Sequence, residues 1–418
     1  MQVSDVNQNT SNTAIICPIV KTRNSAWQDG DVLLNEAEGL VLAMGQTVVW
    51  KQAVKLNKII PSSFFGKGNL EKIKQYCQDY QVDLVVIDET ISAVQQRNLE
   101  KFWQVKVIDR TAVILEIFGG RAHTKEGKLQ VELAHLTYQR GRLVRSWTHL
   151  ERQRGGGGFM GGPGETQIEL DRRHIDERIV KIKKDLDKVK QTRQLHRVNR
   201  VKVPFPVVAL VGYTNAGKSS LFNFITKEKV FAEDMLFATL DPTMRKIEPA
   251  KGVNLILSDT VGFISNLPHE LVMAFRATLE EVLEADVILH VIDAANPLAK
   301  KQKDDVLTVL HELGLEKIET DSNYIEVFNK IDLLDEVERK ARIKRNSAKC
   351  VAVSAVTGEG TDALLKVIAD KFIQKQKVET CKIKITDGKK LAEIYETAEV
   401  LSRREDEQFI YLKVRKII

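Results

Sequence analysis

The sequence predicts an α/β protein of several domains, and three observations support this fold class. From residue 14 onward, short runs of aliphatic and β-branched residues alternate with helix-like segments, as in parallel sheets covered by helices. The run at residues 207–212 leads into a glycine-framed loop that opens a helix. Two stretches within residues 121–200 repeat apolar residues at spacings of three and four, which predicts long helices. At 418 residues the chain can hold several domains with buried cores.

The N-terminal third predicts a tail followed by a small α/β subdomain. Residues 1–13 are polar, and we expect a disordered tail. Residues 14–120 should form a mostly parallel sheet with helices. No phosphate-binding motif occurs there, so we expect no chemistry of its own. The predicted strands are apolar runs at 14–20, 39–45, 47–54, 83–88 and 105–109, and the predicted helices span about 62–80 and 93–102.

Residues 121–200 predict an antiparallel helical hairpin with a glycine-rich tip. Between the two helical stretches lies RQRGGGGFMGGPGET, whose seven glycines and one proline continue neither helix. The apolar seams of the two helices should pack together. They comprise Leu129, Leu133, Leu136, Arg140, Leu143, Trp147 and Leu150, and Ile168, Arg172, Ile175, Ile179, Ile182, Leu186 and Val189.

The hairpin also carries the basic charge of the chain. Residues 121–200 contain 19 Lys and Arg against 10 Asp and Glu, a net charge of +9, whereas the whole chain carries +6. An elongated basic arm favours contact with phosphate backbones. At the tip, apolar side chains with no visible core to join could stack on unpaired bases. The candidate RNA-binding residues are Arg152, Arg154, Phe159, Met160, Arg172 and Arg173.

Residues 207–221 predict a phosphate-binding loop. Gly212 and Gly217 frame the pattern G-x-x-x-x-G-K-S, which Lys218 and Ser219 complete. Backbone N–H groups can wrap around phosphates there, and the following helix directs its positive end toward them. Lys218 would reach the β and γ phosphates, and the Ser219 hydroxyl would bind Mg²⁺.

A base-reading element predicts guanine as the preferred base. Asn329, Lys330 and Asp332 form N-K-x-D after a strand-like run, where α/β sheets bind ligands. The Asp332 carboxylate can accept both the N1–H and the 2-amino group of guanine, a donor pair that adenine lacks. Ser354 and Ala355 follow another strand, in a loop whose backbone N–H can meet guanine O6.

A third element lies between these two. Asp259 ends a strand and would hold Mg²⁺ through water, while the Gly262 N–H meets the γ-phosphate. Thr239 is our choice for the threonine that closes over Mg²⁺, with Thr243 as its competitor. Phe263 occupies the position where many small GTPases carry a water-orienting glutamine, so slow intrinsic hydrolysis is expected.

GYTNAGKS, FATLDPT, DTVG, NKID and SA together resemble the G domain of a translation-type GTPase, specifically of the HflX family. The tip sequence GPGETQIELDRR resembles that family's signature loop. The resemblance implies a GTPase that uses Mg²⁺, binds the large ribosomal subunit through its N-terminal region and splits stalled ribosomes. The implied catalytic residues are Lys218, Thr239 and Gly262. The implied nucleotide-binding residues are Gly212, Tyr213, Thr214, Asn215, Ala216, Gly217, Lys218, Ser219, Ser220, Phe237, Ala238, Thr239, Leu240, Asp241, Asp259, Thr260, Val261, Gly262, Asn329, Lys330, Ile331, Asp332, Ser354 and Ala355.

Asn215 resembles the phosphate-loop asparagine that helps to bind K⁺ in cation-activated GTPases. A turn position with a left-handed backbone explains an asparagine equally well, so both interpretations stay open. His290 and His269 receive no catalytic role, because isolated histidines are more often structural.

The G domain should span residues 201–375, and residues 376–418 should form a small C-terminal α+β domain of strand, helix and strand. Four cysteines without metal-binding spacing fit a reducing cytosol. We expect a monomeric cytoplasmic protein without stable membrane insertion, and peripheral membrane attachment stays open. Two other functions remain: a remodeller of structured RNA, and a regulatory switch that recruits a protein or membrane partner.

Overall fold

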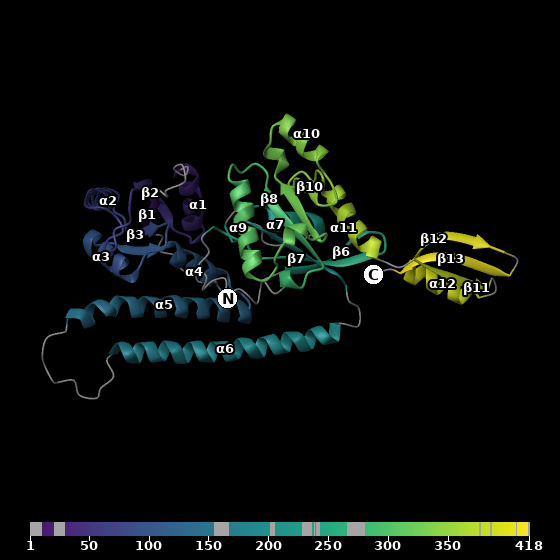
Figure 1. Ribbon diagram of the computed structural model, residues 1–418, viewed down its shortest axis with the longest axis horizontal. Helices are drawn as coiled ribbons and strands as arrows, with labels where there is room; N and C mark the ends of the chain where they lie inside the picture. Colours follow the sequence, from purple (N-terminus) through teal and green to yellow (C-terminus); the bar gives the residue numbers. More distant parts are fainter. Residues whose placement is uncertain are drawn as a thin grey trace, which may run out of the picture. The chain divides into compact units, whose positions relative to one another are not determined.

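The computed structural model describes residues 11–20, 30–153, 167–200, 205–227, 236–237, 239, 243–265, 281–375, 378–384, 387–406 and 408–416. The chain divides into two compact units. Unit 1 comprises residues 1–196 with the segments 234–240 and 267–275, and unit 2 comprises the remainder. Among the described helices, none is both long and apolar enough to cross a membrane. Figure 1 labels the elements of both units.

The described part of unit 1 contains a parallel sheet with strand order β2-β1-β3-β4. This confirms the predicted α/β subdomain. Its strands are β1 (Asn12–Val20), β2 (Thr47–Leu56), β3 (Leu84–Ile87) and β4 (Lys106–Asp109), and its helices are α1 (Gly30–Ala43), α2 (Lys67–Asp79), α3 (Ala93–Trp103) and α4 (Arg110–Arg121). Strand β1 begins two residues before the predicted start, and Thr13 within it is fully buried.

One predicted strand of unit 1 is wrong. Residues 39–45 lie at the C-terminal end of α1 and in the turn after it. The buried residues of α1 are Leu34, Ala37, Leu40 and Val41, at spacings of three, three and one. That spacing places them on one helical face, and the apolar run at 39–45 is partly this face. The prediction considered only the run at 39–45 and missed Leu34 and Ala37, which continue the same helical face toward the N-terminus.

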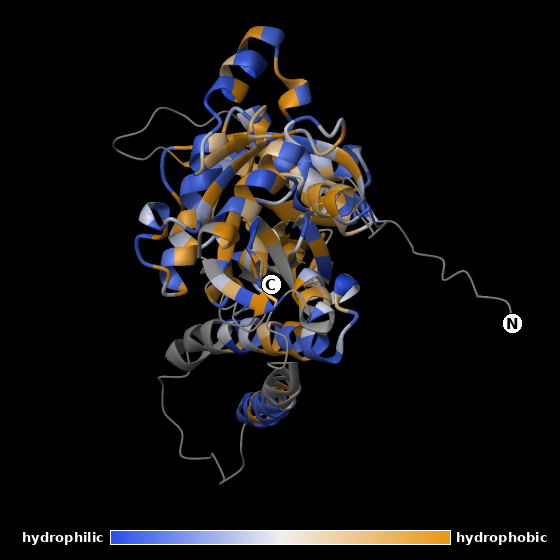
Figure 2. Ribbon diagram, turned by 90° about the vertical axis from the view of Figure 1, so that its right-hand side faces the viewer, coloured by the Kyte–Doolittle hydropathy of each residue, from blue (hydrophilic) through white to orange (hydrophobic). Residues whose placement is uncertain are grey.

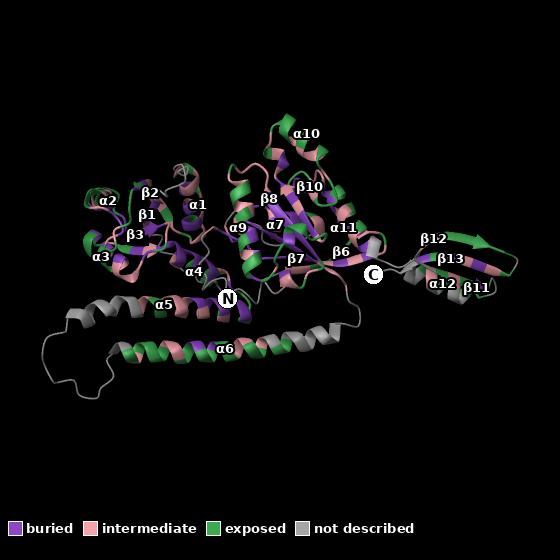
Figure 3. Ribbon diagram, in the orientation of Figure 1, coloured by how far each residue is buried: buried purple, intermediate pink, exposed green. Residues whose placement is uncertain are grey.

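Two long helices follow α4, as predicted. They are α5 (Lys125–Gln153) and α6 (Gln167–Arg200). Ion pairs of 2.8 Å between Arg140 and Asp176 and of 2.5 Å between Arg178 and Glu132 join them in an antiparallel arrangement. Figure 3 shows α6 largely exposed, and Figure 2 colours its described turns mostly hydrophilic. The tip, residues 154–166, lies outside the described residues.

The seams predicted for these helices differ in burial. On α6, Ile179 and Ile182 are buried, as the seam requires. On α5, Leu129, Leu133, Leu136 and Leu143 are only half-buried, and the buried residues described there include Gln130, Val131 and Ala134. These residues lie on the side of α5 that contacts α3 and α4. Helix α5 therefore has two packing faces, one toward α6 and a more buried one toward the α/β subdomain.

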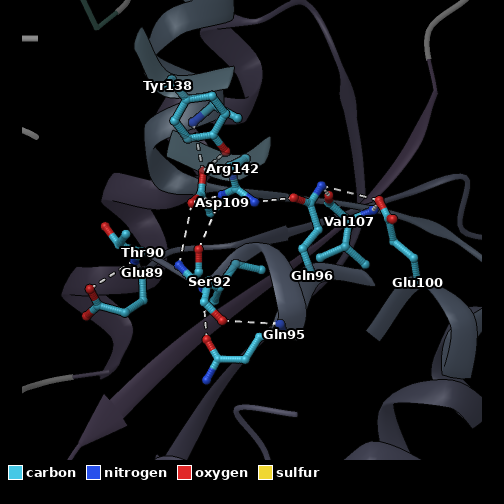
Figure 4. Close-up of polar contacts among 12 residues, drawn as sticks. Glu89, Thr90, Ser92, Gln95, Gln96, Glu100, Val107, Asp109, Tyr138 and Arg142 are labelled. Atoms are coloured by element: carbon cyan, nitrogen blue, oxygen red, sulfur yellow. Dashed lines mark hydrogen bonds and ion pairs between the residues drawn. The ribbon is translucent and has the colours of Figure 1, made fainter. Parts of the chain in front are cut away.

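A buried polar network secures that second face (Figure 4). Asp109 caps the N-terminus of α4 by accepting from the Ala112 N–H at 2.9 Å. It also accepts from the Tyr138 hydroxyl at 2.8 Å and from the Arg142 guanidinium at 2.5 Å, both on α5. Arg142 also donates to the Gln96 side chain on α3. Burial, reinforced by the Asp109 charge, raises the pKa of Tyr138, which keeps its hydroxyl protonated as a donor.

The main sheet of unit 2 has strand order β10-β9-β8-β5-β7-β6 and is parallel except for β6. This confirms the mostly parallel G-domain sheet. Its strands are β5 (Val207–Gly212), β6 (Thr243–Ala250), β7 (Val253–Asp259), β8 (Val287–Asp293), β9 (Tyr324–Asn329) and β10 (Cys350–Ala352), and its helices are α7 (Lys218–Thr226), α9 (Ala299–Glu312), α10 (Glu336–Lys344) and α11 (Thr361–Lys375).

Helices α7 and α11 cover one face of this sheet. Leu221 and Phe222 of α7 and Leu364 and Ile368 of α11 share one buried cluster with residues of β5, β7, β8 and β9. Helix α9 packs beside β8, where Lys303 forms a 2.5 Å ion pair with Glu326 on β9. The motifs lie at the carboxyl ends of β5, β7, β8 and β9. These strands belong to a sheet with a well-packed core.

The C-terminal domain is an antiparallel sheet of order β11-β13-β12 with one helix. Its elements are β11 (Val378–Lys384), α12 (Gly388–Thr397), β12 (Ala398–Glu405) and β13 (Phe409–Lys416). The run KKLAEIYETAEVLSR at residues 389–403 predicts one helix, but this helix was too long, because residues 398–403 belong to β12. Pairing with β13 and the packing of Val400 in the domain core favour the strand there.

Candidate functional site

The glycine-framed loop follows β5 directly and needs both of its outer glycines. Gly212 has φ +152°, and a Cβ there would lie 2.2 Å from the carbonyl oxygen of Val291 on β8. Gly217 has φ +86°, and a Cβ there would lie 2.2 Å from Nδ2 of Asn329. A side chain at either position would displace a neighbouring strand or the asparagine of the N-K-x-D motif. The motif spacing therefore follows from close packing as well as from phosphate chemistry.

Lys218 begins α7 and is buried, with 5% of its surface exposed. Its Nζ donates to the carbonyl oxygens of Tyr213 at 2.8 Å and of Gly212 at 3.1 Å. Burial lowers the pKa of Lys218 to about 8, while the charge of Asp259 acts in the opposite direction. An added phosphate would favour the ammonium form, so nucleotide binding would strengthen the positive charge of the loop.

Ser219 and Asp259 form the second polar pair. The Ser219 hydroxyl donates to Oδ2 of Asp259 at 2.6 Å, and Asp259 is fully buried at the end of β7. A hydroxyl and a carboxylate are hard oxygen ligands of the kind that Mg²⁺ prefers. Beside them, the Thr260 hydroxyl donates to the Leu210 carbonyl at 2.6 Å, a bond that sequence reasoning did not predict. These residues fit a magnesium ion.

The segment after Asp259 is tied to the phosphate loop through the backbone. The Thr214 N–H donates to the Phe263 carbonyl at 2.6 Å, and the Phe263 N–H donates to the Gly212 carbonyl at 3.1 Å. A Cβ at Gly262 would lie 3.0 Å from Nζ of Lys218. The structure thus places Gly262 next to the lysine, while its contact with the γ-phosphate stays a prediction. Phe263 is buried, and its apolar ring offers no group that could orient water.

Three side chains of the N-K-x-D motif have separate partners. Asn329 is buried, donates to the Ala216 carbonyl at 2.9 Å and accepts from the Ala355 N–H at 3.0 Å. It therefore links the phosphate loop to the loop after β10. Lys330 pairs with Asp293 at 2.8 Å. Sequence reasoning missed Asp293, although its place at the end of β8 matches that of Asp259 on β7.

Asp332, the last residue of the N-K-x-D motif, is oriented by a residue that follows β10. Its Oδ1 accepts from the Ser354 hydroxyl at 2.6 Å. The same hydroxyl accepts from the Thr357 N–H at 3.1 Å, which fixes its proton toward Asp332. The structure therefore brings the predicted Asp332, Ser354 and Ala355 together at the carboxyl ends of β9 and β10, where their hydrogen-bonding groups can meet one base.

Of the predicted residues in the segment 237–241, Phe237 and Thr239 are described, and both belong to unit 1. Phe237 has φ +57° and is buried edge-on against Phe118 of α4, with ring centroids 4.7 Å apart. Thr239 is partly buried. Ala238, Leu240 and Asp241 lie outside the described residues, so the nucleotide contacts of this segment stay a prediction.

The candidate RNA-binding residues are described only in part. Arg172 and Arg173 are exposed on α6, and Arg173 lies 3.4 Å from Glu177 one turn further along. The backbone of Arg152 belongs to α5, whereas its side chain lies outside the description. Arg154, Phe159 and Met160 also lie outside the described residues.

His290 has a structural environment. It is buried, and its Nδ1 lies 2.6 Å from the Tyr324 hydroxyl. Burial lowers the pKa of His290 to about 3, so the ring is neutral at physiological pH. This agrees with the absence of a catalytic role in the sequence analysis. His269 lies outside the described residues.

A parallel sheet, a phosphate loop on its central strand, a hydroxyl and carboxylate pair suited to Mg²⁺ and a guanine-type base motif define a P-loop GTPase. Four family models match the chain: "GTP-binding GTPase N-terminal" at residues 31–119, "GTP-binding GTPase Middle Region" at 121–200, "50S ribosome-binding GTPase" at 207–330 and "HflX C-terminal domain" at 337–415.

Curated relatives agree with these matches. The chain is 48% identical to "GTPase HflX" of Magnetococcus marinus over 91% of this chain and 87% of that protein. It is 41% identical to "GTPase HflX" of Escherichia coli over 96% and 93%. The chain therefore belongs to the HflX family of GTPases, which hydrolyse GTP. Among solved structures, a GTP-binding protein from Sulfolobus solfataricus with GDP has 23% identity and a TM-score of 0.46, covering 87% of this chain and 99% of that one.

Proposed function

We propose that this GTPase binds the large ribosomal subunit through its N-terminal region and splits stalled ribosomes under the control of GTP. The observation that carries the proposal is the pairing of a guanine-type site with a helical hairpin of net charge +9. Ribosomal RNA is the phosphate-rich partner that such an arm fits. The name of the family model matched by residues 207–330, "50S ribosome-binding GTPase", supports the same partner. We place this activity in the cytoplasm and expect a monomer.

In this proposal the phosphate loop and Lys218 hold the phosphates of GTP or GDP. Ser219, Asp259 and Thr239 would hold Mg²⁺, which would neutralise charge on the phosphate oxygens. The Gly262 N–H would donate to the γ-phosphate. Asp332 would accept two hydrogen bonds from guanine, and Asn329 would keep the base loop and the phosphate loop in register through its hydrogen bonds to Ala216 and Ala355.

The first experiment tests the consequence of having Phe263 in place of a water-orienting glutamine. Because its buried ring orients no water, intrinsic hydrolysis should be slow and should require a partner. Steady-state GTP hydrolysis should be measured alone, with purified large ribosomal subunits and with protein-free ribosomal RNA. Stimulation by subunits alone is expected. Equal stimulation by bare RNA would instead identify an RNA remodeller, and no stimulation would contradict the proposal.

A monovalent cation is the second source of catalytic help. Asn215 is exposed in the loop with φ +59°, a conformation that asparagine adopts with or without a ligand. If its side chain helps to bind K⁺, turnover should be higher in KCl than in NaCl of equal concentration. Asn215→Gly keeps access to the left-handed turn but removes the amide, so it should abolish the difference. Equal rates of the unmodified protein in both salts would refute K⁺ activation.

A further inference from the structure

The C-terminal sheet has two different faces. On one face, Ile383, Leu412 and Val414 are buried in a cluster that includes Leu391 and Ile394 of α12. Helix α12 thus covers this face, and Figure 1 shows it along one side of the sheet. Arg403 of β12 also lies on this side, where it contacts Tyr395 of α12. Because side chains alternate along a strand, the intervening residues point to the opposite face.

The opposite face combines aromatic and basic residues. Phe409, Tyr411 and Lys413 alternate along the central strand β13. In the register of the sheet, Lys384 stands opposite Phe409, and Lys382 and Arg404 stand on either side of Tyr411. Thr380 and Ser402 flank Lys413 in the same way. We call Phe409, Tyr411, Lys382, Lys384, Lys413 and Arg404 the aromatic-basic face.

The charges of this face are available to a ligand. Lys382, Lys384, Lys413 and Arg404 are exposed, and none forms an ion pair with another residue in the part of the chain that the structure describes. Lys382 lies over both rings, with Nζ 3.9 Å from the centroid of Phe409 and 5.2 Å from that of Tyr411. These rings therefore lie on the surface beneath a cation, outside the core formed with α12.

One carboxylate lies at the edge of the face. Asp406, in the turn before β13, accepts from the Gln408 N–H at 2.9 Å and from the Phe409 N–H at 2.6 Å. These backbone bonds lower the pKa of Asp406, and a hydrogen bond with Tyr411 contributes further. Asp406 thus anchors the turn, while the four cations remain in excess on the face.

We propose that the aromatic-basic face binds single-stranded RNA, with bases stacked on Phe409 and Tyr411 and phosphates held by the surrounding lysines and arginine. Unpaired bases present a flat apolar surface that matches the half-buried rings on this open sheet face, and the backbone supplies the negative charge that four cations require. Paired bases are hidden in a duplex, so a duplex should bind less well. The proposal goes beyond the function proposed for the hairpin, and only the choice of RNA over DNA rests on it.

The test uses the full chain from which residues 155–164 have been deleted, so that the hairpin tip does not contribute. Binding of a fluorescently labelled ten-nucleotide oligouridine RNA is followed by anisotropy, with a duplex of equal length as comparison. Phe409→Ala with Tyr411→Ala should lower the affinity for the single strand at least about tenfold. Tyr411→Phe keeps the ring and should bind as before. Tyr395→Ala removes an exposed tyrosine from the α12 side and should have no effect.

A second pair of substitutions tests the charges without altering the rings. Lys382→Gln with Lys413→Gln should weaken binding severalfold and lower the slope of log affinity against log salt by about 1.4. Unchanged affinity in the aromatic variant with a wild-type melting transition would overturn the proposal, as would tighter binding of the duplex. If the aromatic variant does not fold, unchanged affinity in the lysine variant would overturn it. Stimulation of GTP hydrolysis by ribosomal subunits, measured in parallel with the tip intact, reports separately on the proposed function.

Discussion

Asp332 illustrates how one side chain sets the choice of nucleotide. Its carboxylate is oriented by the Ser354 hydroxyl, which is itself held by the Thr357 N–H. An oriented carboxylate accepts from two donors on guanine and would remain unpaired beside adenine. The energetic penalty for an unpaired buried charge is what makes such a site selective.

We therefore predict that Asp332→Asn lowers the affinity for GTP about 100-fold, since one acceptor is replaced by a donor that faces the 2-amino group. Xanthine carries an oxygen at that position, so affinity for xanthosine triphosphate should rise. Both affinities can be measured by competition with a fluorescent guanine nucleotide. Ser354→Ala leaves the carboxylate in place and should cost less. Unchanged GTP affinity in Asp332→Asn would show that Asp332 does not bind the base.

Most of the nucleotide site could be predicted at the residue scale because its chemistry depends on short spacings. Gly212, Gly217, Lys218 and Ser219 follow from a single motif, and the structure adds only the reason why the glycines tolerate no side chain. Asp293 could not be found in the same way, because its partner Lys330 follows another strand, β9, and only the sheet order brings them together.

At the scale of elements, sequence patterns predicted the helices better than their packing. The seam of α6 matches its buried face, whereas α5 is buried most deeply on a different side. A leucine repeat cannot reveal this, because Asp109, Tyr138 and Arg142 attach α5 through polar contacts with no apolar period. The helix predicted before β13 was too long for a related reason, since pairing of β12 with β13 ends α12 at Thr397 and an isolated helical pattern does not show that pairing.

The polar network predicts a large difference between two arginines. Arg142→Ala leaves the buried Asp109 with an uncompensated charge, and we expect it to destabilise the α4–α5 region by about 3 kcal/mol. Arg178→Ala removes an ion pair whose arginine side chain is 66% exposed, and should cost less than about 1 kcal/mol. Native-state hydrogen exchange of α4 and α5 amides would measure both. Equal effects would contradict the role assigned to the network.

At the scale of the whole molecule, the chain separates nucleotide chemistry from the proposed RNA contact. The phosphate loop, the Ser219–Asp259 pair and the base motif all belong to unit 2. The basic hairpin belongs to unit 1 up to His196. The sequence motifs predicted this division, because glycine-framed loops and long heptad-like seams require different architectures.

Two changes should therefore separate the activities. Lys218→Ala should reduce GTP binding or hydrolysis at least tenfold and leave most of the affinity for ribosomal RNA, because it removes only a phosphate-loop cation. Deletion of residues 155–164 should do the reverse. Nucleotide affinity, hydrolysis and RNA binding would be measured for both proteins at one salt concentration. If each change abolished both activities, the two functions would not be separable.

Helix α6 adds a mechanical consequence. Its 34 residues make it about 50 Å long. It ends at Arg200, and residues 201–206 alone lie between it and Val207, where the strand of the phosphate loop begins. A helix of this length acts as a lever, because a rotation of about 10° at its base would carry its far end through roughly 9 Å. In the proposed function, such a displacement is the step by which GTP hydrolysis would separate the ribosomal subunits.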